Sequence, residues 1–96
     1  MFARISKYRM KPGSIAAAKT LLDELKPQIM ALPGMSQFIN VMNDDGRGYV
    51  VAVVDSEEVS NANQSKVQEI WAKFSDHLAE PPTTEGYNVV ANESNG

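Results

Sequence analysis

The sequence has 96 residues, of which 43% are hydrophobic and 22% charged, with a formal net charge of −3. Because it has no cysteine and one histidine, disulfides and thiolate chemistry are excluded, and we predict no metal site and no cofactor. The negative charge disfavours nucleic acid and anionic membranes as partners. With no signal peptide and no apolar run long enough to span a membrane, we expect a cytoplasmic protein.

The first predicted element is a strand from Phe2 to Met10. Its alternation places Ala3 and Ile5 on one face and Ser6 and Tyr8 on the other. A Pro-Gly pair then breaks the strand, and Ser14 is a suitable N-cap for a helix. That helix carries one apolar stripe, formed by Ile15, Ala18, Leu22, Leu25, Ile29 and Leu32. Pro27 removes a backbone donor, so we expect a kink or a break near Lys26.

A β-hairpin is predicted next. Two apolar, β-branched and aromatic runs flank the polar, glycine-bearing segment 43–48. The second run, Tyr49 to Val54, is apolar at every position, whereas a half-solvated strand would alternate. We therefore expect this strand to be covered on both faces.

The last third of the chain is predicted to hold helix and then strand. Segment 55–78 begins with a capping pattern at Asp55 and ends with an apolar face around Trp71 and Phe74, so it forms either one kinked helix or two helices. Prolines 81 and 82 end it. Tyr87 to Ala91 is expected to be the final strand.

The resulting order, β-α-β-β-α-β, predicts an α+β, ferredoxin-like domain over residues 1–91, followed by a flexible tail of residues 92–96. Two helices cover only one face of a four-stranded antiparallel sheet. Since the hairpin offers apolar side chains to both faces, a second copy of the same sheet is the simplest cover for the other face. We therefore predict a homodimer through the sheet.

Several segments resemble the antibiotic-biosynthesis-monooxygenase-like family of the dimeric α+β-barrel superfamily. They are Tyr8–Gly13 before the helix, Leu32–Phe38 at the start of the second strand, Asn43–Arg47 before the strand that ends in Asp55–Ser56, and Trp71–Leu78. The resemblance covers nearly the whole chain. It implies ferredoxin-like subunits whose sheets pack face to face, and a pocket between sheet and helices in each subunit. It also implies activities that include cofactor-free oxygenation of aromatic compounds.

The resemblance does not extend to haem degradation. Relatives with that activity use an Asn on the first strand, and Ser6 stands at the matching position here. Trp71 and His77 are also six residues apart, about 120° around a helix, so they cannot converge on one small ligand. A partial match of Arg47 to Val53 to a strand motif of RNA-recognition domains lacks the later aromatic residues, which disfavours RNA binding.

The candidate site residues are those that such pockets use to orient and polarise a phenolic substrate. We predict that Tyr8, Asn40, Tyr49, Trp71 and His77 bind substrate, and we assign no catalytic residue. The predicted function is that of a small-molecule pocket protein resembling cofactor-independent monooxygenases, with a small hydrophobic or aromatic ligand. The alternative is a non-catalytic, ligand-binding or stress-response dimer, in which Trp71 fills the core and His77 lies at its edge.

Overall fold

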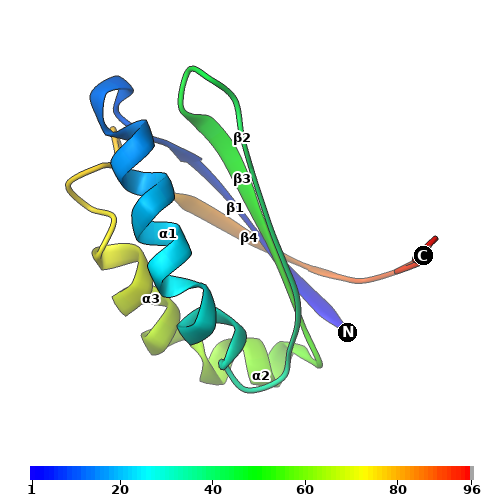
Figure 1. Cartoon of the computed structure of the whole chain (residues 1–96). Helices are drawn as coiled ribbons and strands as arrows, with labels where there is room; N and C mark the ends of the chain where they lie inside the picture. Colours follow the sequence, from blue (N-terminus) through cyan, green and yellow to red (C-terminus); the bar gives the residue numbers. More distant parts are fainter. Residues whose placement is uncertain (96) are drawn as a thin grey trace.

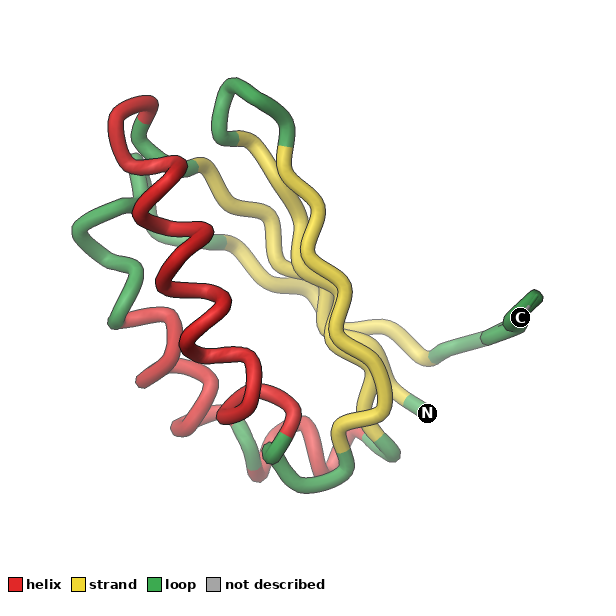
Figure 2. The backbone as a smooth tube through the Cα atoms, viewed as in Figure 1, coloured by secondary structure: helices red, strands yellow, loops and turns green. Residues whose placement is uncertain are grey.

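The computed structural model describes residues 1–95 as one antiparallel sheet with helices packed on one of its faces (Figures 1 and 2). The strands are β1 (Phe2–Arg9), β2 (Met35–Met42), β3 (Arg47–Val54) and β4 (Thr83–Asn88), in the spatial order β2-β3-β1-β4. The helices are the 3-10 turn η1 (Pro12–Ser14), α1 (Ile15–Met30), α2 (Glu57–Ala62) and α3 (Gln64–Ala72). The predicted α+β, ferredoxin-like order is confirmed.

Strand alternation divides the sheet into an inner face, under the helices, and an outer face. On β1, Ser6 and Tyr8 are buried on the inner face, and Ala3 and Ile5 lie on the outer face. Tyr8 is paired across the ladder with Gly48 of β3. The predicted assignment of faces for β1 agrees with this arrangement, because successive strand residues point to opposite sides.

α1 is one continuous helix from Ile15 to Met30, with Pro27 inside it. The expected break near Lys26 does not occur. Pro27 lies in the last turn at an exposed position, and the carbonyl that loses its donor belongs to exposed Asp23, where water can replace the missing bond. Ser14 precedes the helix but makes no side-chain cap, because η1 leads directly into α1.

The segment after β3 forms two helices, which is one of the two arrangements predicted. Ser56, rather than Asp55, caps α2: its hydroxyl accepts a hydrogen bond from the Val59 amide at 3.2 Å. Asn63 separates α2 from α3, and its side-chain amide donates to the Pro33 carbonyl at 2.8 Å. Among the described helices, none is long and apolar enough to cross a membrane.

The last strand, β4, begins at Thr83, four residues before its predicted start. It pairs with β1 from Phe2–Asn88 to Lys7–Thr83. Every residue of β4 is exposed, so this edge strand is held by backbone hydrogen bonds and carries no apolar pattern for sequence reasoning to detect. Residues 92–95 have no regular secondary structure, and Gly96, the end of the predicted tail, lies outside the described residues.

The helices lie on one face of the sheet (Figure 2), and the outer face carries large apolar side chains that are about half exposed. The exposed fractions are 48% for Ile39, 52% for Val41, 47% for Tyr49 and 49% for Tyr87. Val51, half-buried, lies between Ile39 and Ile5 in the cross-strand register. On the outer face of β3, Val53 is buried within the chain, whereas Val51 is half-buried and Tyr49 is exposed. The predicted cover of this exposed part of the outer face by a second copy stays a prediction.

Candidate functional site

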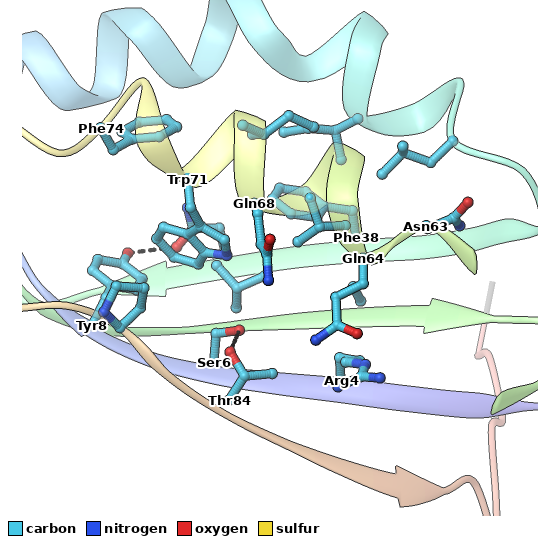
Figure 3. A pocket seen from close by; sticks show the side chains of 18 of the residues that line it. Arg4, Ser6, Tyr8, Phe38, Asn63, Gln64, Gln68, Trp71, Phe74 and Thr84 are labelled. Atoms are coloured by element: carbon cyan, nitrogen blue, oxygen red, sulfur yellow. Dashed lines mark hydrogen bonds between the residues drawn. The ribbon is translucent and has the colours of Figure 1, made fainter. Parts of the chain in front are cut away.

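A cavity of about 390 Å³ lies between the inner face of the sheet and the helices. All four strands contribute to its floor, β4 through Thr84 alone, and the helices supply its other walls (Figure 3). Most of the lining is apolar, including Phe38, Val50 and Ile70, and polar groups are few. A cavity with this combination of size and lining is typical of small-molecule sites, which measure about 300–1,000 Å³.

An aromatic cluster of Tyr8, Trp71 and Phe74 forms one end of the cavity (Figure 3). The Trp71 ring centroid lies 6.0 Å from that of Tyr8 and 6.3 Å from that of Phe74, in tilted and edge-on arrangements. These are favourable geometries for aromatic pairs. Phe74 is buried, whereas Trp71 is only half-buried and packs against the edge of the core, so the indole forms a wall of the cavity.

The hydroxyl of Tyr8 reaches β2. It donates to the Asn40 side-chain oxygen at 2.5 Å and lies 3.2 Å from the Val41 carbonyl. Burial raises the pKa of the Tyr8 phenol. Tyr8 is therefore a neutral hydrogen-bonding group at neutral pH and not a phenolate base.

This raised pKa predicts how stability depends on pH. The folded state keeps Tyr8 protonated to a higher pH than the unfolded state does, whose pKa is about 10. The contribution of Tyr8 protonation to the free energy of unfolding is therefore fully present below about pH 10, and it is lost as the pH rises through the folded-state pKa. Urea unfolding between about pH 8 and 11 will show a steeper alkaline loss of stability for the native protein than for Tyr8→Phe. Parallel pH profiles for the two proteins would contradict this assignment.

The other end of the cavity is polar and is built on β1. The Ser6 and Thr84 hydroxyls form a hydrogen bond of 2.8 Å. The Arg4 guanidinium donates to Ser60 at 2.5 Å and to Asn61 at 2.8 Å, which ties β1 to α2. Two exposed amides of α3, Gln64 and Gln68, also line the cavity, and Figure 3 shows both directed from α3 toward the sheet.

The structure brings three of the five predicted site residues together and separates two. Tyr8, Asn40 and Trp71 line the cavity. Tyr49 lies on the outer face of β3, and His77 follows α3 outside the cavity lining, where its backbone carbonyl accepts from the Lys11 amide at 2.7 Å. Within residues 1–95, His77 Nδ1 is buried and has no hydrogen-bond partner. A ligand in this cavity would not contact Tyr49. Substrate binding by the five residues stays a prediction.

Sequence reasoning missed the polar end of the cavity. Arg4 has the same strand parity as Ser6 and Tyr8, so alternation already placed a charged residue on the face that the helices cover. A charged residue in such an inward position was the available signal. Gln64 and Gln68, four residues apart and in line with Trp71, form a stripe on α3 that a search for apolar residues does not detect.

No family model matches the chain, and no curated protein matches it either. Solved structures do match it across nearly its whole length. One, a protein of unknown function from Nitrosomonas europaea, has 20% identity and a TM-score of 0.82, covering 99% of this chain and 94% of that chain.

Two further structures are provisionally assigned as antibiotic biosynthesis monooxygenases. The protein from Nitrosomonas europaea has 19% identity and a TM-score of 0.80, covering 95% of this chain and 100% of that chain. The protein from Chloroflexus aurantiacus J-10-fl has 23% identity and a TM-score of 0.74, covering 99% and 98%. Likeness at these identities establishes the fold, and the predicted structural resemblance is confirmed. The chain has the ferredoxin-like fold of the antibiotic biosynthesis monooxygenase structures.

Proposed function

We propose that the protein binds a small aromatic molecule in the cavity between sheet and helices and oxygenates it without a cofactor. The observation that carries this proposal is the convergence of Tyr8, Asn40 and Trp71 on one cavity of about 390 Å³. Trp71 offers an aromatic face to a planar ligand. Solved structures of the same fold that are provisionally assigned as antibiotic biosynthesis monooxygenases support the choice of reaction.

The hydrogen bond between Tyr8 and Asn40 leaves complementary groups for a ligand. The Tyr8 proton is given to the Asn40 oxygen, so the phenolic oxygen can accept another hydrogen bond. The Asn40 amide nitrogen keeps its two donors. A phenolic hydroxyl that donates to Tyr8 and accepts from Asn40 would satisfy both groups, and its ring would lie beside Trp71. This pairing would also favour the partly ionised phenol that reacts with oxygen, because the amide stabilises the developing negative charge.

The proposed reaction balances without an external reductant. A phenol with a free para carbon and one O₂ give a quinone and one water. One oxygen atom forms the new carbonyl, the other leaves as water, and the ring loses two hydrogens. The protein's part is to bind and orient the phenol and to keep Tyr8 neutral as a hydrogen-bonding partner.

Oxygen uptake with α-naphthol tests the activity. We expect one O₂ consumed for each naphthoquinone formed, with at least about tenfold slower turnover in Tyr8→Phe, which removes the hydrogen-bonding oxygen. Tyr49→Phe, the same change on the outer face, serves as the matched control and should keep the native rate. Binding of α-naphthol without oxygen uptake would favour the non-catalytic alternative, and no binding would contradict the proposal as a whole.

We further propose that two copies associate through the outer face of the sheet. Ile39, Val41, Tyr49 and Tyr87 are each about half exposed there, and they surround half-buried Val51 and Ile5. A contiguous apolar surface of this kind is typical of a protein interface. Pairing two such faces would cover β3 on both sides, as its uninterrupted apolar sequence predicts.

The dimer is tested by placing one charge on this surface. Ile39→Asp should shift the native dimer to a monomer in sedimentation velocity at micromolar concentration, because association would bury an unpaired carboxylate. Met30→Asp is the matched control: Met30 is also 48% exposed, but it ends α1, away from the outer face. A native protein that sediments as a monomer, or an equal effect of both substitutions, would contradict the proposed interface.

A further inference from the structure

We infer that Arg4 selects substrates carrying a single carboxylate, held at the end of the cavity away from the aromatic cluster of Tyr8, Trp71 and Phe74. The inference rests on the proposed function of the cavity and goes beyond it by naming the substrate class. Among the described residues that line the cavity, Arg4 alone is charged, and its positive charge stands out in a chain whose net charge is −3. Within residues 1–95, no acidic side chain forms an ion pair with it.

Arg4 is held in a fixed orientation. Its Nε donates to the Ser60 hydroxyl at 2.5 Å, and its Nη2 donates to the Asn61 side-chain oxygen at 2.8 Å. The guanidinium also lies 5.9 Å from the centroid of the Phe2 ring, within the range of a cation–π interaction. Ser60 is itself buried, 6% exposed, so the contact on this side is not a mobile surface pair.

These contacts occupy one edge of the guanidinium. An arginine has five N–H donors in a planar fork, and Nε with Nη2 forms the edge used by Ser60 and Asn61. The other edge, formed by Nη1 and the second N–H of Nη2, has no hydrogen-bond partner within residues 1–95. Two parallel N–H groups of this kind match the two oxygens of a carboxylate.

The charge balance favours a carboxylate over a phosphate. One arginine neutralises one carboxylate, whereas a doubly charged phosphate would keep an uncompensated charge in a mostly apolar cavity. The neighbouring groups in the lining, Ser6, Thr84, Gln64 and Gln68, are neutral and add no second cation.

The position of Arg4 also indicates the shape of the substrate. Arg4 and Tyr8 lie on the same face of β1, four residues apart, so their Cα atoms are separated by about 13 Å. Figure 3 shows Arg4 and Tyr8 toward opposite ends of the cavity, with Ser6 and Thr84 between them. A substrate that reaches both has a phenolic ring beside Trp71 and a carboxylate on an extension of that ring, attached at a carbon other than the para carbon that is oxygenated.

Calorimetric titration with p-coumarate, its methyl ester and p-hydroxystyrylphosphonate tests this inference. The three molecules share the p-hydroxystyryl body and differ in the terminal group, which is a singly charged carboxylate, a neutral ester, or a phosphonate that is doubly charged above its second pKa. Their para carbon is substituted, so none of them can form a quinone and the titration measures binding alone. For the native protein we expect at least about tenfold tighter binding of p-coumarate than of either the ester or the doubly charged phosphonate. Equal binding of acid and ester would overturn the inference and leave the proposed function standing. If the protein binds none of the three molecules and does not bind α-naphthol either, both the inference and the proposed function are contradicted.

Substitutions locate the source of the preference. In Arg4→Gln the ratio of acid to ester affinity should fall to less than about twofold. Lys7→Gln, the matched control, removes the same charge from the outer face of β1 and should keep the native ratio. An unchanged ratio in Arg4→Gln, or tighter binding of the phosphonate than of p-coumarate by the native protein, would overturn the assignment. The native comparison needs no variant, so the inference can be tested even if Arg4→Gln does not fold.

Discussion

Replacing Trp71 by alanine will weaken α-naphthol binding about thirtyfold and leave the fold largely intact. The indole supplies the aromatic face at one end of the cavity, beside Tyr8, and its loss removes about 2 kcal/mol of contact with a planar ligand. Because Trp71 is only half-buried, its removal should cost less than the about 3–5 kcal/mol typical of a core aromatic residue. Calorimetry measures the binding, and urea unfolding measures the stability.

Phe74→Ala is the matched comparison. Phe74 packs against Trp71, but it is 6% exposed and belongs to the core, so its loss should cost the full about 3–5 kcal/mol of stability. The two variants therefore separate a cavity wall from a core residue. If Trp71→Ala unfolds as easily as Phe74→Ala, the tryptophan holds the core together. If Trp71→Ala binds α-naphthol as the native protein does, the indole has no part in the site.

Gly48→Ala will destabilise the protein by about 3 kcal/mol, at the upper end of the range for overpacking. A Cβ at this position would overlap the carbonyl oxygen of Val41 and the end of the Tyr8 ring, which lies directly over Gly48 in the cross-strand pair. The missing side chain is thus what lets Tyr8 extend across β3 to Asn40 on β2. The backbone carbonyl cannot move without disturbing the ladder between β2 and β3.

Urea unfolding of Gly48→Ala beside Gly13→Ala measures this effect. A Cβ at Gly13 would meet no other atom within 4 Å, so the control should change stability by less than about 1 kcal/mol. A Gly48→Ala protein as stable as the native one would show that the Tyr8 side chain does not need the space above Gly48 to reach Asn40.

The sheet and its helices could be predicted because their signals are local. The apolar stripe of α1 and the two runs of the hairpin follow directly from burial on one face. β4 was placed four residues late because an exposed edge strand is held by backbone hydrogen bonds, which any side chain permits. Pro27 was expected to kink or break α1, and the helix is continuous because the cost of a missing donor depends on its exposure, which only the fold determines.

The candidate site was predictable only where strand parity places its residues. Tyr8 and Asn40 lie on inward positions of their strands, and Tyr49 lies on an outward one. The two tyrosines are therefore on opposite faces of the sheet, and the helices cover only the face with Tyr8. Arg4 shares the parity of Tyr8, yet a search for aromatic side chains passed over it. Its partners, Ser60 and Asn61, are more than fifty residues away in the chain, and no local pattern links them to β1.

The most direct test of the central claim, that the cavity between sheet and helices is the binding site, is a nitrogen-15 NMR titration with α-naphthol. The chain has one tryptophan, so the indole N–H of Trp71 gives a single, assigned signal inside the cavity. We predict that this signal and the side-chain amides of Asn40 and Gln68 shift on binding, while the side-chain amide of Gln37, on the outer face of β2, shifts much less. Shifts confined to the outer face, or an unchanged Trp71 signal at saturating α-naphthol, would contradict it.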